Sequence, residues 1–204
     1  MMPIAEQQSL ELATAAPPGT RRLFRRAYRS RGVLVAPAII AAAVAAWSAR
    51  PHGITLAAGG SLFVAGWLGR MWAQRHLGYR LRRRMRLTTC GPYRCIRNPV
   101  YVANTLVVTG TTLMSGSPAL AAGAALLCAG VYGLTVRHEE AFLARWYGHR
   151  YLAYCRTTPR WLPAVPATSA AAGCTCARSW ADVVRAEWHV VLLVAPVLIP
   201  LVVG

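Results

Sequence analysis

The sequence predicts an all-α integral membrane protein whose helices cross the bilayer about five times. Of its 204 residues, 55% are apolar and only 14% are charged, whereas charged residues make up about 25% of an average soluble domain. The apolar residues gather in long stretches, and a helix that spans a membrane needs about 20 of them. All 23 basic residues are arginines, and they cluster between those stretches.

Four stretches supply the five expected spans. They cover residues 33–49, 54–69, 100–136 and 188–204. The third is long enough for two helices, and we expect the chain to turn back at residues 115–118, which read Ser-Gly-Ser-Pro. Each half is then short for a span, so a re-entrant hairpin is the alternative. We expect one membrane domain over 33–204, with an additional C-terminal transmembrane helix over 183–204.

The arginine clusters predict the orientation in the cell membrane. Six arginines lie in 21–31, eight in 75–97 and six in 137–178, while the loops after the first and third spans carry one between them. Arginine-rich segments stay on the cytosolic side. We therefore expect residues 1–32 to form a cytosolic basic tail, both long polar segments to face the cytosol, and the C-terminus to lie outside. Membrane lipids explain these clusters, and nucleic acid is not an expected partner because no nucleic-acid-binding motif accompanies them.

The six cysteines and five histidines show no spacing typical of a disulfide framework or a zinc site. We expect free thiols and no bound metal. Cys174 and Cys176 form the one close pair, and the sequence assigns no role to it.

The first polar segment runs from Leu87 to Tyr101 and reads Leu-Thr-Thr-Cys-Gly-Pro-Tyr-Arg-Cys-Ile-Arg-Asn-Pro-Val-Tyr. Its Gly-Pro and Asn-Pro pairs keep it out of regular helix. In a membrane protein, such backbone persists only where water, protein or a ligand satisfies its polar groups. The alternative is an ordinary loop whose arginines contact lipid headgroups.

The second polar segment, 137–163, carries aromatic residues at helical spacing up to Pro159. Such a stripe alone usually means packing. Glu139 and Glu140 are two of only six acidic residues in the chain, and they lie among arginines. The alternative to a binding role is that both glutamates pair with those arginines.

Together the two segments resemble the signatures of the isoprenylcysteine carboxyl methyltransferase and phospholipid methyltransferase-like family of integral membrane proteins. The first segment resembles LVTxGPYxxxRHPxYxG, with matches in 87–93 and 97–101. The second resembles EExxLxxxFGxxYxxYxxxxPRxxP, with matches at Glu139, Glu140, Leu143, Tyr147, Gly148, Tyr151, Tyr154, Pro159, Arg160 and Pro163. The resemblance covers 85–163 and implies a methyltransferase-like core over 75–165.

The resemblance implies a methyltransferase that uses S-adenosyl-L-methionine at the cytosolic membrane face. Its cofactor pocket would form between the loop before the third helix and the segment after the fourth. The acceptor would be a lipophilic carboxylate, thiol, amine or lipid, and no catalytic residue is assigned. The motif match assigns substrate contacts to Arg97 and Glu140, and cofactor contacts to Met85, Arg86, Leu87, Thr88, Tyr93, Asn98, Pro99, Val100, Tyr101 and Glu139.

Three residues depart from the family pattern. Asn98 replaces the histidine of RHP, and Ala103 replaces the glycine that follows the signature tyrosine. Thr135 stands where the carboxyl methyltransferases have an arginine, one helical turn before the first glutamate. The alternative function is therefore a scaffold diverted from methyl transfer, acting with a membrane protein partner in a complex that modifies a biosynthetic peptide, for example as an epimerase.

Overall fold

The structure, a computed structural model, describes residues 34–47, 52–77, 87–165 and 178–203, and the regular elements in these ranges are all helices. The all-α prediction is confirmed for this part of the chain. The elements in order are the helix Leu34–Trp47, α3 (Gly53–His76), the short 3₁₀ helix η2 (Gly91–Arg94), α4 (Pro99–Leu113), α5 (Pro118–Tyr147), α6 (His149–Thr157), α7 (Trp180–Glu187), the 3₁₀ helix η3 (Trp188–Leu193) and α8 (Ala195–Val203).

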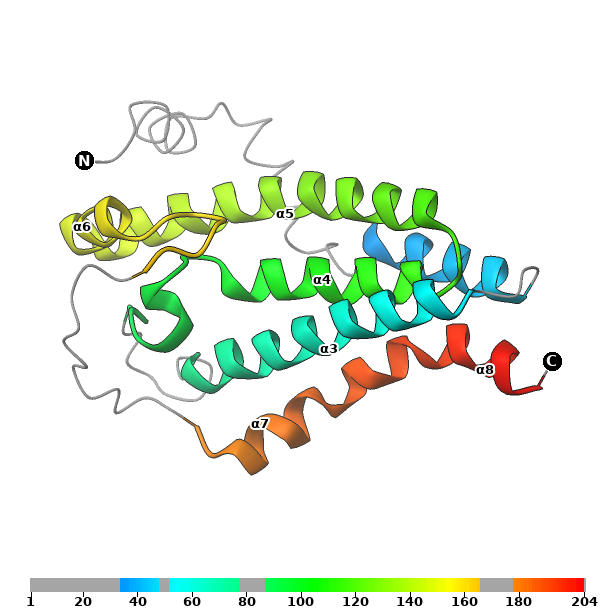
Figure 1. Ribbon diagram of the computed structural model, residues 1–204. Coiled ribbons are helices and arrows are strands. Elements are labelled where there is room, and N and C mark those ends of the chain that lie inside the picture. Colours follow the sequence, from blue (N-terminus) through cyan, green and yellow to red (C-terminus); the bar gives the residue numbers. More distant parts are fainter. Residues whose placement is uncertain (1–33, 48–51, 78–86, 166–177, 204) are drawn as a thin grey trace.

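Helices α3, α4 and α5 run alongside one another, with α4 between the other two (Figure 1). The segment from α7 to α8 lies along α3, and α6 lies beside the end of α5 that is remote from the α4–α5 turn. The basic N-terminal tail expected over 1–32 lies outside the described residues.

The turn expected at 115–118 is confirmed. Helix α4 ends at Leu113 and α5 begins at Pro118. A proline suits the first position of a helix because its missing N–H would have no partner there. Ser117 caps α5, since its side-chain oxygen accepts a hydrogen bond from the backbone N–H of Leu120 at 3.3 Å.

Small residues let α3 and α4 pack closely. A Cβ atom added at Gly66 would lie 2.7 Å from the backbone N of Val107, and one added at Gly110 would lie 2.5 Å from that of Phe63. Such close backbone approach through small residues is typical of membrane helices. Ala103, at a position where the family has glycine, is buried in this crossing.

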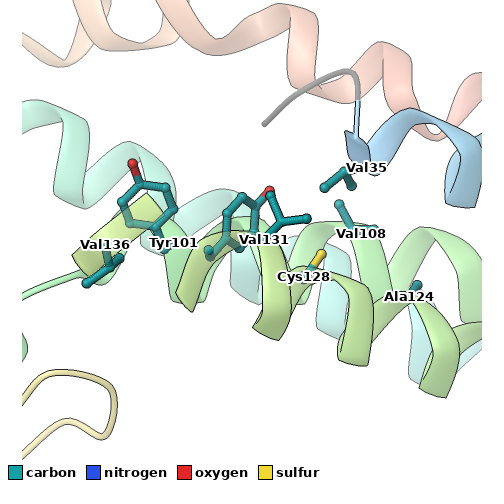
Figure 2. Close-up of a cluster of buried hydrophobic side chains, with 8 residues drawn as sticks. Val35, Tyr101, Val108, Ala124, Cys128, Val131 and Val136 are labelled. Carbon is teal, nitrogen blue, oxygen red and sulfur yellow. The ribbon is translucent and has the colours of Figure 1, made fainter. Parts of the chain in front are cut away.

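Two apolar clusters hold the bundle together. One joins Tyr101 and Val108 of α4 to Tyr132 and other residues of α5, with Val35 packed against them (Figure 2). The other joins α3 and α4 to the C-terminal segment through Val190, Val194 and Val197.

Two helices, α3 and α5, are long and apolar enough to cross a membrane. The helix Leu34–Trp47 and α4 are shorter, and the expected C-terminal span is divided into α7, η3 and α8. Long apolar helices of this kind associate a chain with a membrane. The five spans and their orientation stay predictions.

Candidate functional site

The two polar segments singled out by the sequence lie against each other. The backbone N–H of Arg97 donates to the carbonyl oxygen of Pro159 at 2.8 Å, and that of Ala164 donates to the carbonyl of Cys95 at 3.0 Å. These hydrogen bonds join the loop before α4 to the chain that follows α6. The first motif and the second therefore form one junction.

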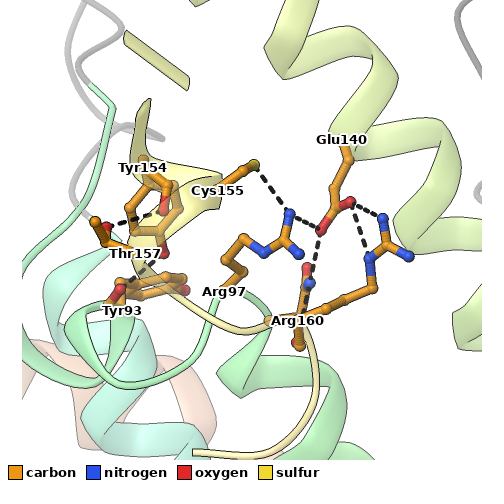
Figure 3. A network of polar contacts seen from close by, with 8 residues as sticks. Tyr93, Arg97, Glu140, Tyr154, Cys155, Thr157 and Arg160 are labelled. Carbon is orange, nitrogen blue, oxygen red and sulfur yellow. Dashed lines mark hydrogen bonds and ion pairs between the residues drawn. The ribbon is translucent and has the colours of Figure 1, made fainter. Parts of the chain in front are cut away.

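Glu140 is the centre of this junction, and its side chain is buried (Figure 3). The Nε and Nη2 atoms of Arg160 donate to its Oε2 atom at 3.0 and 2.6 Å. On the other side, Nη1 of Arg97 lies 3.4 Å from its Oε1 atom, and Nδ2 of Asn98 donates to Oε1 at 3.2 Å. Charge-assisted bonds of this kind are about twice as strong as neutral ones. We call Arg97, Asn98, Glu140 and Arg160 the Glu140 network.

The local sequence explains how Asn98 reaches Glu140. Asn98 precedes Pro99 and stands at the N-cap of α4, but its side chain makes no capping bond. Instead it donates to Glu140 and, at 3.3 Å, to the carbonyl oxygen of Arg160. The departure from the family's histidine thus places an amide in the network, where it bridges both motifs.

Gly148 turns the chain so that α6 packs back against α5. Its φ of 53° lies in the left-handed region, which glycine adopts without steric cost. Tyr151 and Cys155 of α6 are buried against Leu143 and Tyr147 of α5. A helix that follows α5 directly thereby closes one side of the junction.

Buried tyrosines and a thiol line the α6 side of the junction. Arg97 Nη1 donates to Cys155 Sγ at 2.9 Å, and the Tyr154 hydroxyl donates to the Tyr93 carbonyl at 2.7 Å. Burial raises the pKa of Tyr151, Tyr154 and Cys155 above their ordinary values. These groups are therefore neutral at physiological pH.

The structure places eight of the ten expected cofactor residues, because Met85 and Arg86 lie outside the described residues. Leu87 packs against the cluster of Tyr151 and Cys155, and Thr88, the next residue, lies outside any helix. Tyr93 lies in η2, Asn98 lies in the Glu140 network, and Pro99, Val100 and Tyr101 form the first turn of α4.

Tyr101 packs inward, its ring centroid 5.1 Å from that of Tyr132. Glu139 is half-buried on α5 beside Glu140. Cofactor contact stays a prediction for every one of these residues.

The two expected substrate residues have a clear structural position. The side chains of Arg97 and Glu140 are each 2% exposed and pair with one another. In this structure they join the two motifs, and their contact with a substrate stays a prediction. Thr135 is fully buried, and its hydroxyl donates to the carbonyl of Val131 in its own helix at 2.8 Å.

Three features were not found from the sequence. The alternative that the glutamates pair with arginines is confirmed for Glu140, but the sequence did not single out Arg160 as its partner. The contact of Cys155 with Arg97 has no signal in the sequence, because a single cysteine has no spacing to a second one. A second buried ion pair joins Arg70 of α3 to Glu187 of α7, and Arg70 also donates to Asn104 of α4. An arginine inside an apolar helix was the available signal.

The cysteines correct one expectation. Cys95, Cys128 and Cys155 are free thiols, as expected, but Cys90 is disulfide-bonded. The expectation of free thiols throughout is wrong for Cys90, because spacing alone does not show which cysteines a fold brings together. Among the residues that the structure describes, no group of three or more histidine, cysteine or acidic residues could hold a metal ion.

Comparisons with known proteins agree with the two motifs. The family model described as phospholipid methyltransferase matches residues 54–150. The chain is 35% identical over 96 residues to the cobalt-zinc-cadmium resistance protein CzcN of Cupriavidus metallidurans. The aligned region is 47% of this chain and 43% of that protein. The chain is 34% identical over 96 residues to the nickel-cobalt-cadmium resistance protein NccN of Alcaligenes xylosoxydans xylosoxydans, which covers 47% and 44%.

The match therefore spans less than half of the length of these relatives. No solved structure matches the chain. The matched region contains the first motif and both glutamates, including Glu140 at the centre of the junction. Residues 54–150 match the family model of the phospholipid methyltransferases, and the resemblance expected from the motifs is confirmed over this segment.

Proposed function

We propose that the protein is a membrane-bound methyltransferase that uses S-adenosyl-L-methionine and acts on a lipophilic acceptor. One observation carries the proposal above all. The two segments that bear the family motifs are 42 residues apart at Asn98 and Glu140, yet their polar side chains meet in one buried network. A family match in sequence is thus accompanied by assembly of the motif residues in space.

The residues at the junction fit the cofactor's chemistry. The amino-acid end and the ribose of S-adenosylmethionine need hydrogen bonds, and Leu87 and Thr88 offer backbone outside any helix. The half-buried carboxylate of Glu139 suits the ribose hydroxyls or the amino group. The ring faces of Tyr93 and Tyr101 suit the adenine or the positive sulfonium. When bound, the cofactor supplies an already activated methyl group.

The chain itself has to position the reactants and keep water out, since methyl transfer from a sulfonium needs the acceptor in line with the methyl group. The Glu140 network contributes by fixing the loop before α4 to the chain after α6. Residues that would hold the cofactor, such as Tyr93 and Pro99, lie on either side of that loop. The network is therefore a positioning element.

The acceptor is proposed by class only. Thr135 offers no positive charge where the carboxyl methyltransferases have an arginine, and its hydroxyl is already used within α5. A carboxylate acceptor would need another cation. A lipophilic thiol, amine or lipid does not need a positively charged side chain at position 135.

A second candidate keeps the fold and loses the reaction. Thr135 and the C-terminal segment, which lies outside the matched family region and packs on α3, favour it. In this version the chain is a subunit of a membrane complex that modifies a biosynthetic peptide, for example by epimerisation.

Cofactor binding tests the proposal. Titration calorimetry on the purified protein in detergent should show S-adenosylmethionine or its demethylated product binding with micromolar or tighter affinity, about 8 kcal/mol or more. Glu139→Gln should weaken binding by about 1.5–3 kcal/mol, the usual range for a hydrogen bond to a charged group. Arg150→Gln, at an exposed position on α6, is the matched control and should bind normally.

A sample that is folded by thermal unfolding and binds neither compound would contradict the methyltransferase and favour the second candidate. A normal affinity in Glu139→Gln would remove Glu139 from the cofactor site and leave the rest of the proposal in place.

A further inference from the structure

Exposed apolar side chains gather at the end of α5 and on α6. Phe142, Trp146 and Leu152 are 49%, 60% and 39% exposed. The rings of Phe142 and Trp146 stack on one another with centroids 5.9 Å apart, so the pair presents one continuous apolar surface. Apolar surface of this size in water is unfavourable unless something covers it.

The length of α5 indicates what covers it. Its 30 residues extend about 45 Å at 1.5 Å per residue. A bilayer is about 40–45 Å thick when its headgroup layers are included. If α5 crosses the membrane from one surface to the other, as its composition allows, its last turn lies in one headgroup layer and the turn before it lies at the boundary with the acyl chains. Phe142 and Trp146 lie in those turns.

Helix α6 lies at the same depth, because Tyr151 and Cys155 pack against Leu143 and Tyr147 near the end of α5. The exposed residues of α6 include Arg150, Leu152 and Arg156. A headgroup layer surrounds a membrane protein, so residues on different sides of α5 and α6 can contact it at once.

The charged side chains that are exposed at the end of α5 and on α6 are all positive. Between residues 137 and 165 the acids are Glu139 and Glu140. Glu140 is buried and bonded to arginines, and Glu139 is half-buried. Arg145, Arg150 and Arg156 are exposed. An aromatic and positively charged surface complements a layer of anionic headgroups.

We propose that Phe142, Trp146, Arg150, Leu152 and Arg156 form a lipid-binding collar that sits in the headgroup layer and prefers anionic phospholipid. The aromatic pair and Leu152 contact the upper part of the acyl chains, and the two arginines contact headgroup phosphates. The collar does not depend on methyl transfer, so it can be tested without activity.

The depth of Trp146 can be measured by fluorescence. The full protein is placed in nanodiscs of phosphatidylcholine that carries a spin label either at the headgroup or at the end of the acyl chain. The fluorescence of Trp146 is obtained as the difference between the wild-type protein and Trp146→Phe. The headgroup label should quench this fluorescence more strongly than the acyl-chain label does. Trp188→Phe is the matched control, since Trp188 is 57% exposed but lies at the start of η3, away from α5 and α6 in the sequence. Its signal should not share that preference for the headgroup label.

The lipid preference is measured with the double variant Arg150→Gln/Arg156→Gln in nanodiscs that contain phosphatidylglycerol as well. Energy transfer to a labelled phosphatidylglycerol should show that the wild-type protein enriches the anionic lipid around itself. In the double variant, the preference for phosphatidylglycerol over phosphatidylcholine should be roughly ten-fold weaker at low salt. Arg185→Gln, which removes an exposed arginine from α7, should keep it.

Two results would overturn the collar. One is a Trp146 signal that neither label quenches, as expected if a protein partner covers the aromatic pair. The other is a double variant that keeps the wild-type preference for phosphatidylglycerol. Both readouts concern exposed side chains, and thermal unfolding of each variant shows whether the fold is retained.

Discussion

Two buried carboxylates, Glu140 and Glu187, are each paired with arginine but stand in different surroundings. Glu140 receives hydrogen bonds from Arg160 and Asn98 and lies next to Arg97. The arginine paired with Glu187 is Arg70, whose side chain is 18% exposed. The first carboxylate lies within the matched family segment and the second lies outside it.

The difference shows how similar groups can have different tasks. Removing a charge from water is costly, and a buried carboxylate persists only when its lone pairs are satisfied. Glu140 satisfies them with donors from both motif segments, so it links distant parts of the site. Glu187 links an added segment to α3, and through Arg70 to Asn104 of α4. We therefore expect the site to depend on Glu140 and the attachment of α7 to depend on Glu187.

The largest effect is expected for Glu140→Gln. The change leaves Arg97 and Arg160 without their shared negative charge while they stay largely buried, and breaking a buried pair in this way costs about 3–5 kcal/mol. The free energy of unfolding, or the midpoint of thermal unfolding in detergent, should fall accordingly. Cofactor affinity should fall as well, because the loop before α4 loses its attachment.

Glu139→Gln is the matched control, since it is the same chemical change at the adjacent position. It should weaken cofactor binding and cost little stability, because Glu139 is only half-buried. Equal losses of stability in the two variants would contradict the special place given to Glu140.

A smaller and more local effect is expected for Glu187→Gln. Arg70 keeps its bond to Asn104 and some access to solvent, so the loss should be about 1–3 kcal/mol, the range for an incompletely satisfied buried group. Limited proteolysis should cut near α7 sooner than in the wild-type protein. Cofactor affinity should be unchanged, and a loss comparable to that of Glu140→Gln would show that the C-terminal segment is part of the site.

Much of the fold could be predicted from residue patterns. The all-helical class followed from long apolar stretches, and the α4–α5 turn followed from Ser-Gly-Ser-Pro at 115–118, where small residues and a proline end one helix and begin another. The division of the expected C-terminal span, 183–204, among the end of α7, η3 and α8 could not be predicted, because hydropathy alone does not distinguish an α-helix from a 3₁₀ helix.

The site was predicted in outline. The motifs placed Asn98 in the first family signature, as a departure from its histidine, and Glu140 and Arg160 in the second, but a pattern in one dimension does not show which side chains face each other. That both oxygens of Glu140 are bonded depends on the rotation of α5, which packing fixes. The pairing of Arg70 with Glu187 is more remote still, since 117 residues separate them and neither belongs to a motif.

The smallest predicted effect concerns alkaline pH and the α6 side of the Glu140 network. Burial raises the pKa of Cys155, and the nearby Arg97 only partly opposes this. The unfolded chain loses the thiol proton near pH 8.5, whereas the folded protein keeps it to higher pH. Above that pH the folded state binds more protons, so the stability that the neutral thiol contributes is present below pH 8.5 and is lost as the pH rises.

Cys155→Ser keeps a small polar group and removes this titration. Between about pH 8.5 and 9.5 the wild-type protein should therefore lose up to about 1 kcal/mol more unfolding free energy than the variant, since one proton corresponds to at most 1.36 kcal/mol per pH unit. Parallel stability profiles for the two proteins would show that the thiol is not held neutral by burial.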